Sequence, residues 1–395
     1  MNRTGKIIIS LFFIITIYLF GGTTLLKARP EIMDILREST ISYMPDQIED
    51  AMTEDFKSRN NWINLNGLFQ RAIGVTLIRD AGDIDVYRMK NGQLTYGYPD
   101  NDMEYAAAEV TGLERFVREN GGEFMYVQLP CKAYSDDLMP AGSHTYGYKD
   151  ADELTQMLKD NGVDVLDLRE EINKAGMETS PLFFNTDHHW KPSTALWAAG
   201  VISEKLSSKV AGYDYDRALY DRNNYETTVY EDWFLGSLGR RTGIFFGGVD
   251  DFEVILPKFD TDYYLYTESQ TDGSVKEREG PFPDALMSLG YLDEKDYFSE
   301  TTYFTYMGTE YRLSTVTNRL APNDKKILML RDSFSCTLEP YLSMSAAEIT
   351  AIDLRYYDTL QIKEYIKNND FDAVMVVYNP SMFREEGAFD FDRQL

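Results

Sequence analysis

The chain has few cysteines and few histidines, and both shortages limit the kinds of site it can contain. Two cysteines, Cys131 and Cys336, are too few for a disulfide framework or a four-cysteine metal site. Each follows a predicted strand, so they are either two buried free thiols or one bridge in an oxidising compartment. Only three histidines occur in 395 residues. The adjacent pair His188 and His189 is therefore the first candidate for a functional site.

Positive charge is also scarce. Lys and Arg number 39 against 65 Asp and Glu, which gives a formal net charge of -26. Such a charge repels nucleic-acid phosphates and anionic lipid surfaces, so we expect no nucleic-acid partner. The 14% aromatic content suits contact with a neutral or cationic glycan. The sequence has no GxSxG, glycine-rich phosphate-binding or HExxH motif, and we expect no cofactor and no metal.

The first 30 residues differ from the rest of the chain. Residues 7–26 read IIISLFFIITIYLFGGTTLL after Arg3 and Lys6, and a helix of that length spans about 30 Å, the thickness of a bilayer's hydrocarbon core. No small-x-small cleavage site follows, so we expect an uncleaved membrane anchor rather than a signal peptide. The predicted topology is single-pass in the cell membrane, with the body extracytoplasmic.

Hydrophobic periodicity divides the remaining chain into two parts. Residues 31–100 predict a helical lead-in and a hairpin that turns at Asn91-Gly92. Residues 101–395 alternate helix and strand, which predicts a parallel sheet with helices on both faces. This α/β pattern is interrupted at about 210–320 by a β-containing insertion rich in Tyr, Gly and Asp. Its aromatic residues either contact sugars or fill a small core.

Ser333 lies where a buried strand, KKILML, gives way to a turn and a helix. Catalytic groups in α/β sheets gather at the carboxyl ends of strands, where a helix N-terminus also favours an oxyanion. The simpler interpretation is that Asp332 or Ser333 only caps the helix. A serine hydroxyl needs a base, and a base needs an orienting carboxylate, which His189 and Asp187 would supply if the two loops meet.

Adjacent histidines on an extended segment point to opposite faces, which disfavours joint metal binding by His188 and His189. We therefore expect His189 to act as the base and His188 to be a structural neighbour, with the reverse assignment kept as the alternative.

TDHHW with a later DSF resembles the DHHW family of SGNH-hydrolase-like proteins, related to AlgJ and AlgX of alginate O-acetylation. The VQLPCKAYS stretch and the early hairpin add to this likeness, which covers roughly residues 50–385. The resemblance implies a three-layer α/β/α, flavodoxin-like fold. It also implies Ser333 as nucleophile, His189 as base and Asp187 as its orienting carboxylate.

Four further residues are weaker candidates for binding substrate or an oxyanion. Asn379 ends the last predicted strand, Arg355 and Tyr356 follow another strand, and Lys132 lies in the VQLPCKAYS stretch. Each of them has an equally ordinary interpretation as a turn residue or a member of a salt bridge.

The expected function is O-acyl transfer, most simply of acetyl, to a cell-envelope or exported polysaccharide. The resemblance implies an integral-membrane acyltransferase partner that supplies the acetyl groups. Two alternatives stay open: a carbohydrate esterase or deacetylase with the same triad, and a catalytically silent glycan-binding module.

Overall fold

An eight-stranded sheet forms the centre of the computed structural model, which describes residues 3–38, 47–48, 56, 58–79, 84–298, 302–385 and 387–392. The strand order is β5-β4-β13-β11-β12-β10-β8-β9. Along this order the first five strands run parallel and the last three join antiparallel. The parallel strands are β5 (Val165–Asp167), β4 (Glu123–Gln128), β13 (Ala373–Tyr378), β11 (Lys326–Arg331) and β12 (Glu348–Ile352).

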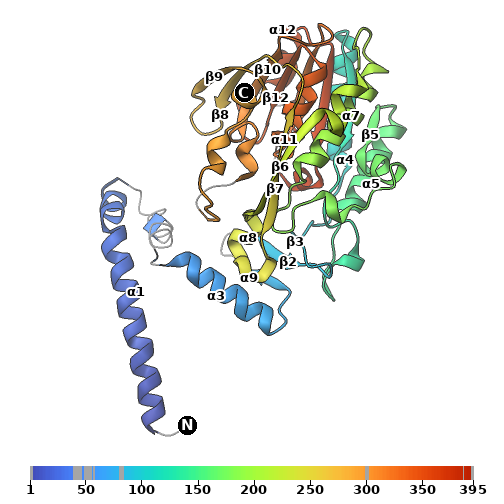
Figure 1. Cartoon of the computed structure of the whole chain (residues 1–395). Helices are drawn as coiled ribbons and strands as arrows, with labels where there is room; N and C mark the ends of the chain where they lie inside the picture. The colour runs from blue at the N-terminus through green and yellow to red at the C-terminus, as the bar shows by residue number, and fades with distance from the viewer. Residues whose placement is uncertain are drawn as a thin grey trace.

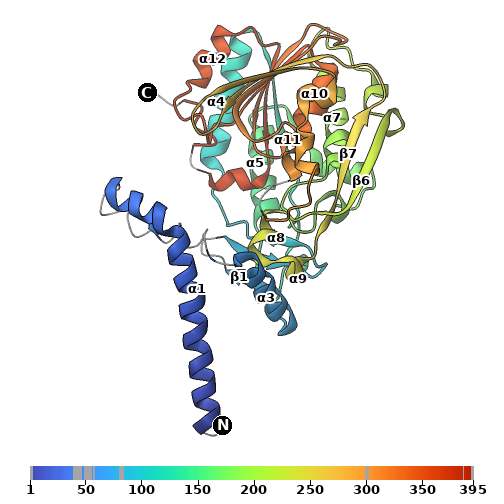
Figure 2. The same ribbon diagram turned by 60° about the vertical axis from the view of Figure 1, so that its left-hand side comes forward.

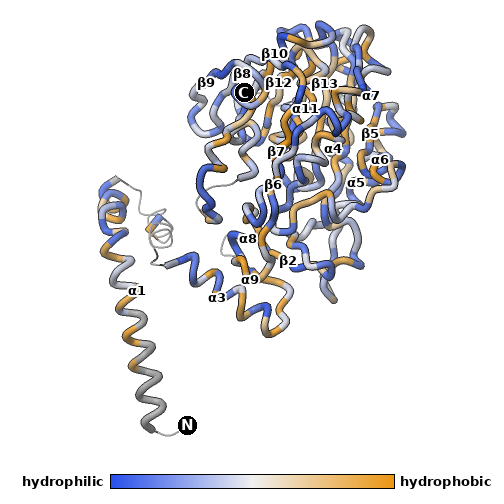
Figure 3. Tube along the Cα trace, viewed as in Figure 1, coloured by the Kyte–Doolittle hydropathy of each residue, from blue (hydrophilic) through white to orange (hydrophobic). Residues whose placement is uncertain are grey.

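The central strands form because their residues are apolar on both faces. Every residue of β13, AVMVVY, is buried, as expected for a parallel strand covered by helices on both sides. Along β11, Ile327 and Met329 enter one hydrophobic cluster while Leu328 and Leu330 enter another. The hydropathy colouring accordingly concentrates the apolar residues in the middle of the body (Figure 3).

Helices cover the two faces of this sheet and complete a three-layer α/β/α arrangement (Figure 2). One cluster contains apolar residues of α7 (Pro192–Ser207) and α11 (Ser335–Leu342). The other contains those of α4 (Glu104–Glu119), α5 (Gly147–Asp160) and α12 (Ile362–Asn368). These helices alternate with the strands of the sheet along the chain, as the sequence predicts, and α6 (Leu168–Lys174) follows β5.

The main sheet is mixed and not purely parallel as predicted, because strands of the insertion join it. Three of its strands extend the main sheet as an antiparallel edge: β10 (Tyr311–Asn318), β8 (Tyr263–Ser269) and β9 (Val275–Gly280). Parallel and antiparallel pairing cannot be distinguished from hydrophobic alternation alone, because both give a period of two. Most aromatic residues of this region that are buried belong to the main core, including Tyr225, Phe234, Phe252, Tyr263 and Phe282. They therefore fill a core rather than a sugar-binding face.

The rest of the insertion forms a separate two-stranded ribbon and short helices. The ribbon pairs β6 (Tyr225–Phe234) with β7 (Asp250–Pro257). Between its strands lie α8 (Ser237–Thr242) and α9 (Ile244–Gly247), and α10 (Phe282–Leu286) follows β9.

Both cysteines, Cys131 and Cys336, are buried and free, which agrees with the interpretation as two buried thiols.

The N-terminal part consists of α1 (Arg3–Glu38), α3 (Arg59–Ala72) and a three-stranded sheet of β1 (Leu77–Arg79), β2 (Asp85–Arg88) and β3 (Leu94–Tyr96). β2 and β3 pair antiparallel across the predicted Asn91-Gly92 turn. Figure 1 shows α1 extending away from the body and α3 lying beside α8 and α9.

The predicted membrane segment, residues 7–26, lies within α1. No helix in the described ranges is long and apolar enough to cross a bilayer, so the predicted transmembrane anchor is not supported. The apolar run is interrupted at Gly21–Thr24, and the same helix then continues into Lys27, Arg29 and Glu31.

Candidate active site

Two loops at the carboxyl ends of the strands bring the predicted triad residues together. Asp187 and His189 lie in the loop before α7, whose ends are paired by a bridge between Phe183 and Trp190. Ser333 lies in the short turn between β11 and α11. Because β11 is a central strand, this is the sheet edge at which ligands of α/β proteins usually bind.

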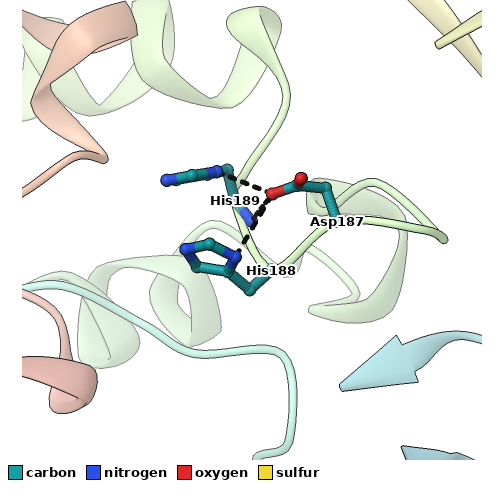
Figure 4. A group of neighbouring side chains, drawn as sticks. All are labelled: Asp187, His188 and His189. Carbon is teal, nitrogen blue, oxygen red and sulfur yellow. Dashed lines mark hydrogen bonds and ion pairs between the residues drawn. The ribbon is translucent and has the colours of Figure 1, made fainter. Parts of the chain in front are cut away.

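A continuous chain of hydrogen bonds joins the three side chains. His189 Nδ1 lies 2.6 Å from Asp187 Oδ1, and His189 Nε2 lies 2.7 Å from Ser333 Oγ. Figure 4 shows the Asp187 carboxylate beside both histidine rings. His189 and Ser333 are 7% and 8% exposed, so only a small part of either residue is accessible. This arrangement can remove a proton from a serine hydroxyl.

The Asp187 carboxylate is ionised, which determines the direction of these bonds. Burial acts to raise its pKa, but the adjacent His189 and His188 and the hydrogen bonds from His189 hold the pKa well below its usual value. An ionised carboxylate only accepts, so His189 Nδ1 donates and His189 Nε2 is left to accept the Ser333 proton. Asp187 Oδ2 also accepts the Ser237 N–H at 2.6 Å.

Lys132, predicted as a substrate or oxyanion contact, is buried beneath this loop. Its ammonium donates to the carbonyl oxygens of Phe184 at 2.6 Å, Asn185 at 3.3 Å and Asp187. Burial lowers its pKa to about 8. An ammonium has three protons, and all three are directed at backbone, so Lys132 orients the loop instead of facing a substrate.

Asp250, which the sequence analysis missed, binds the same loop through its N–H groups. Its carboxylate accepts from the backbone of Asn185 at 2.6 Å and Thr186 at 2.8 Å, and from the Thr186 hydroxyl at 2.6 Å. Asp250 begins β7 of the insertion, and no local sequence pattern distinguishes this buried residue from the acidic residues on the surface. The buried Lys132 cation thus binds carbonyl oxygens of this short segment, and the buried Asp250 anion binds its N–H groups.

The turn before α8 packs directly against Asp187. A Cβ atom at Gly236 would lie 2.2 Å from Asp187 Cβ, which leaves no space for any side chain there. The Gly236 N–H donates to the Thr186 hydroxyl at 2.9 Å. The glycines of FLGSLG therefore permit a close approach that aims the Ser237 N–H at Asp187.

Trp190 and Tyr303 join the histidine loop to the serine turn. The Trp190 indole donates to the Phe334 carbonyl at 3.1 Å and to Thr337 Oγ1 at 2.9 Å. The Tyr303 ring stacks on His189 with centroids 4.1 Å apart and planes 12° apart. Its hydroxyl donates to the Ser333 carbonyl at 3.2 Å. Trp190 follows His189 in the motif, whereas Tyr303 comes from the insertion and had no sequence signal.

Asp332 and Asn379 stabilise the serine turn from the other side. Asp332 is buried and accepts the N–H groups of Phe334 at 2.9 Å and Asn379 at 2.6 Å, and burial raises its pKa to about 6. The Asn379 side chain donates to the Pro130 carbonyl at 2.5 Å and accepts from Ser381 N–H at 3.0 Å. These contacts make Asn379 a bridge between strand ends, and they favour a structural role over an oxyanion contact.

Arg355 and Tyr356 reach the same edge of the sheet but are engaged with acidic residues. Arg355 forms two hydrogen bonds with the buried Asp353, at 2.9 and 2.6 Å. The Tyr356 hydroxyl donates to Glu310 at 3.0 Å. Arg355 is near enough to lower the pKa of His188 further, so it contributes positive charge to the site without contacting the triad.

His188 packs on His189, with ring centroids 3.8 Å apart. Its Nδ1 lies 3.4 Å from Asp187 Oδ1 and 3.4 Å from Ser237 Oγ. The ligand atoms of Asp187, His188 and His189 lie within 4.8 Å of one another, which would suit a metal ion. The two rings lie together beside Asp187, so the expectation that they point to opposite faces is wrong. A metal ion bound by His189 Nδ1 would replace its hydrogen bond to Asp187, on which the proposed role of His189 as a base depends.

Comparison with known proteins finds one matching protein-family model. Residues 93–236 match the family model "SGNH hydrolase-like domain, acetyltransferase AlgX". The chain is similar to that family. The matched range contains β3, Asp187, His189 and Gly236, and it ends before Ser333. The resemblance predicted from the motifs is thus confirmed, while no curated protein sequence matches the chain.

Solved structures share the fold. Bacillus cereus PatB1 with a sulfonyl adduct superposes with a TM-score of 0.65 at 20% identity, covering 78% of this chain and 98% of PatB1. A DHHW family protein from Eubacterium siraeum gives a TM-score of 0.56 at 20% identity, covering 81% of this chain and 98% of that protein. At such identities the likeness establishes the fold.

Gly236→Ala should disrupt the site because the new methyl group must displace Asp187. We expect the free energy of unfolding to fall by about 1–3 kcal/mol, the usual range for overpacking, and the reaction of Ser333 with a sulfonyl fluoride to slow. Urea denaturation and intact-mass kinetics would measure these effects. Gly112→Ala in α4, with no neighbouring atom within 4 Å, is the control and should leave both values intact or improve stability. An unchanged sulfonylation rate in Gly236→Ala would contradict this account.

His188 should make the protein sensitive to acid. Burial, followed by the neighbouring His189, holds its pKa well below the usual value of about 6.5. As pH falls below about 6.5 the unfolded chain binds a proton at this position and the folded chain does not, so stability is lost. His188→Asn should therefore lose less stability between pH 7 and pH 5 than the wild type. Equal slopes for His188→Asn and the wild type would refute the assignment.

Proposed function

We propose that this protein is an O-acyltransferase that forms an acyl-enzyme on Ser333 and passes the acyl group to a polysaccharide hydroxyl. The observation that carries the proposal is the pair of short hydrogen bonds from Asp187 through His189 to Ser333 at the carboxyl end of the sheet. The match to a domain described as an acetyltransferase supports acetyl as the group transferred. A sulfonyl adduct is known for PatB1.

In the first half-reaction Ser333 Oγ attacks the carbonyl carbon of the acyl donor while His189 Nε2 takes the serine proton. The tetrahedral intermediate collapses, the donor's leaving group departs with that proton, and an ester remains on Ser333. Asp187 stabilises the imidazolium formed at His189 through the Nδ1–H bond. The Tyr303 ring stacked on His189 limits ring rotation during the transfer.

In the second half-reaction a sugar hydroxyl gives its proton to His189 and attacks the acyl carbon. Ser333 leaves and recovers the proton, so the enzyme returns to its starting state and the sugar carries the ester. Transfer prevails over hydrolysis when the sugar hydroxyl is held next to the acyl carbon in place of water.

The same triad would also support an esterase, in which water replaces the sugar hydroxyl. The hydrogen-bonded and well-supported triad favours either enzyme over a catalytically silent glycan-binding module. An extracytoplasmic location and an integral-membrane acyltransferase that supplies acetyl groups belong to the same proposal. They rest on the resemblance of the TDHHW and DSF motifs to the acyltransferases of alginate O-acetylation.

Ser333→Ala should abolish formation of a covalent adduct with phenylmethylsulfonyl fluoride, because only the activated hydroxyl can displace fluoride from sulfur. Ser335→Ala is the matched control: Ser335 lies two residues away and is buried, and its hydroxyl has no hydrogen-bond partner within the described part of the chain. Intact-mass spectrometry should find one adduct on the wild type and on Ser335→Ala. His189→Gln should react slower than the wild type by several orders of magnitude. An adduct on Ser333→Ala would remove Ser333 from the proposal.

A further inference from the structure

Exposed apolar side chains are concentrated at one end of the chain. Among the described residues, 14 of the 20 large apolar side chains that are exposed lie between Leu11 and Ile73. They occupy α1 and α3, whereas the rest of the chain contributes isolated positions such as Val229 and Leu320. Isolated exposed apolar residues are ordinary, but a contiguous apolar surface marks a contact with a membrane or with another molecule.

Helix α3 has the reverse of the polarity expected for a helix packed on a protein core. Its inner side presents Asn64 and Gly67 to the body: Asn64 Oδ1 accepts the Ile244 N–H at 2.9 Å, and a Cβ at Gly67 would lie 2.1 Å from the Thr242 carbonyl oxygen. Its outer side bears apolar residues at helical spacing, namely Trp62 (40% exposed), Leu65 (53%), Leu68 (47%), Phe69 (59%) and Ile73 (58%). We call these five residues the α3 face.

The charge of α3 also differs from that of the chain. The helix carries Arg59 and Arg71 and no acidic residue, although the protein as a whole has a formal net charge of -26. Arg71 donates to the Phe245 carbonyl at 3.1 Å on the side of the body. An apolar face that contains Trp and Phe, on a helix without acidic residues, suits a membrane interface. Anionic lipid repels acidic residues. Because α3 has none, it can approach an anionic membrane more readily than the acidic rest of the protein.

Helix α1 meets the α3 face at one ring contact. The rings of Trp62 and Phe20 meet edge-on with centroids 5.4 Å apart. Tyr18, Leu25 and Leu26, which are 78%, 52% and 72% exposed, lie on the side of α1 away from Phe20, because an α-helix turns once every 3.6 residues. The four remaining residues of the α3 face therefore form an apolar surface of their own.

We propose that the α3 face docks on a lipid surface, with α3 lying in the plane of the membrane interface. This mode of contact requires no spanning helix, because only one side of α3 enters the lipid.

The position of α3 links this contact to the triad. α3 packs on α8 and α9 (Figure 1), and the first residue of α8, Ser237, donates to Asp187. The lipid-facing helix and the triad thus lie on the same side of the body, separated by α8 and α9. If Ser333 takes an acyl group as proposed above, docking of α3 would hold the acceptor serine close to a membrane-borne acyl donor. This last step rests on the proposed function, whereas lipid docking does not.

A fluorescent label on the α3 face tests the docking directly in the full chain. Phe69→Cys would be labelled with an environment-sensitive nitrobenzoxadiazole group, since the native Cys131 and Cys336 are buried. Vesicles of phosphatidylcholine with one third phosphatidylglycerol, with and without nitroxide-labelled lipid, are the probe. Leu320→Cys, which is 57% exposed on the body, is the matched control. We expect the Phe69 label to brighten several-fold on vesicles and to be quenched by nitroxide lipid, and the Leu320 label to do neither.

A second pair of variants separates α3 from α1, which is present in every protein tested. Leu65→Glu with Ile73→Glu should lower nitroxide quenching at the Phe69 label several-fold, while Val229→Glu with Leu320→Glu should leave it unchanged. A Phe69 label that stays unquenched on vesicle-bound protein overturns the proposal. So does a label that becomes shielded without vesicles as protein concentration rises, because the face would then bind a second copy. Sulfonylation of Ser333, measured on the same samples, reports separately on the proposed function.

Discussion

The backbone of residues 184–187 is held between a buried cation and a buried anion, and the geometry of the site depends on this arrangement. The Lys132 ammonium donates hydrogen bonds to the carbonyl oxygens on one side. The Asp250 carboxylate accepts hydrogen bonds from the N–H groups on the other side. A loop with so few regular hydrogen bonds would otherwise leave buried backbone groups unpaired, which is costly. Removing either charge would leave the other buried and uncompensated, so the two act as one support.

Three segments far apart in the sequence converge on this support. The histidine loop contributes Asp187 and His189, and the β11 turn contributes Ser333. The insertion contributes the surrounding contacts through Asp250, Gly236 and Tyr303. Trp190 then ties the histidine loop to the serine turn by its indole N–H. The distances among Asp187, His189 and Ser333 therefore depend on contacts with residues outside these three, and the proposed reaction requires such a preorganised arrangement.

The α/β body and the meeting of Asp187, His189 and Ser333 could be expected from the sequence because both have local signals. Strands such as β11 and β13 are apolar along their whole length, and Ser333 and His189 lie at recognisable strand-to-helix and loop-to-helix boundaries. The supporting residues had no such signal, because Asp250 and Tyr303 act across 65 and 30 residues of chain respectively. Lys132 was predicted as a substrate contact, but its partners are backbone carbonyl oxygens. No sequence motif indicates contacts of this kind. The direction of β10, β8 and β9 depends on pairing between segments far apart in the sequence. Alternation of apolar and polar residues does not specify that direction.

The central claim is that Ser333 carries the acyl group between a donor and a sugar. It is tested most directly by mixing the full chain with 4-nitrophenyl acetate, quenching the reaction, and locating the acetyl group by peptide mass mapping with and without a panel of neutral oligosaccharides. The account predicts acetate esterified to the peptide containing Ser333, which disappears faster when an acceptor glycan is present and leaves an acetylated sugar. Acetyl found elsewhere in the chain, or released only as free acetate across the whole panel, would contradict it.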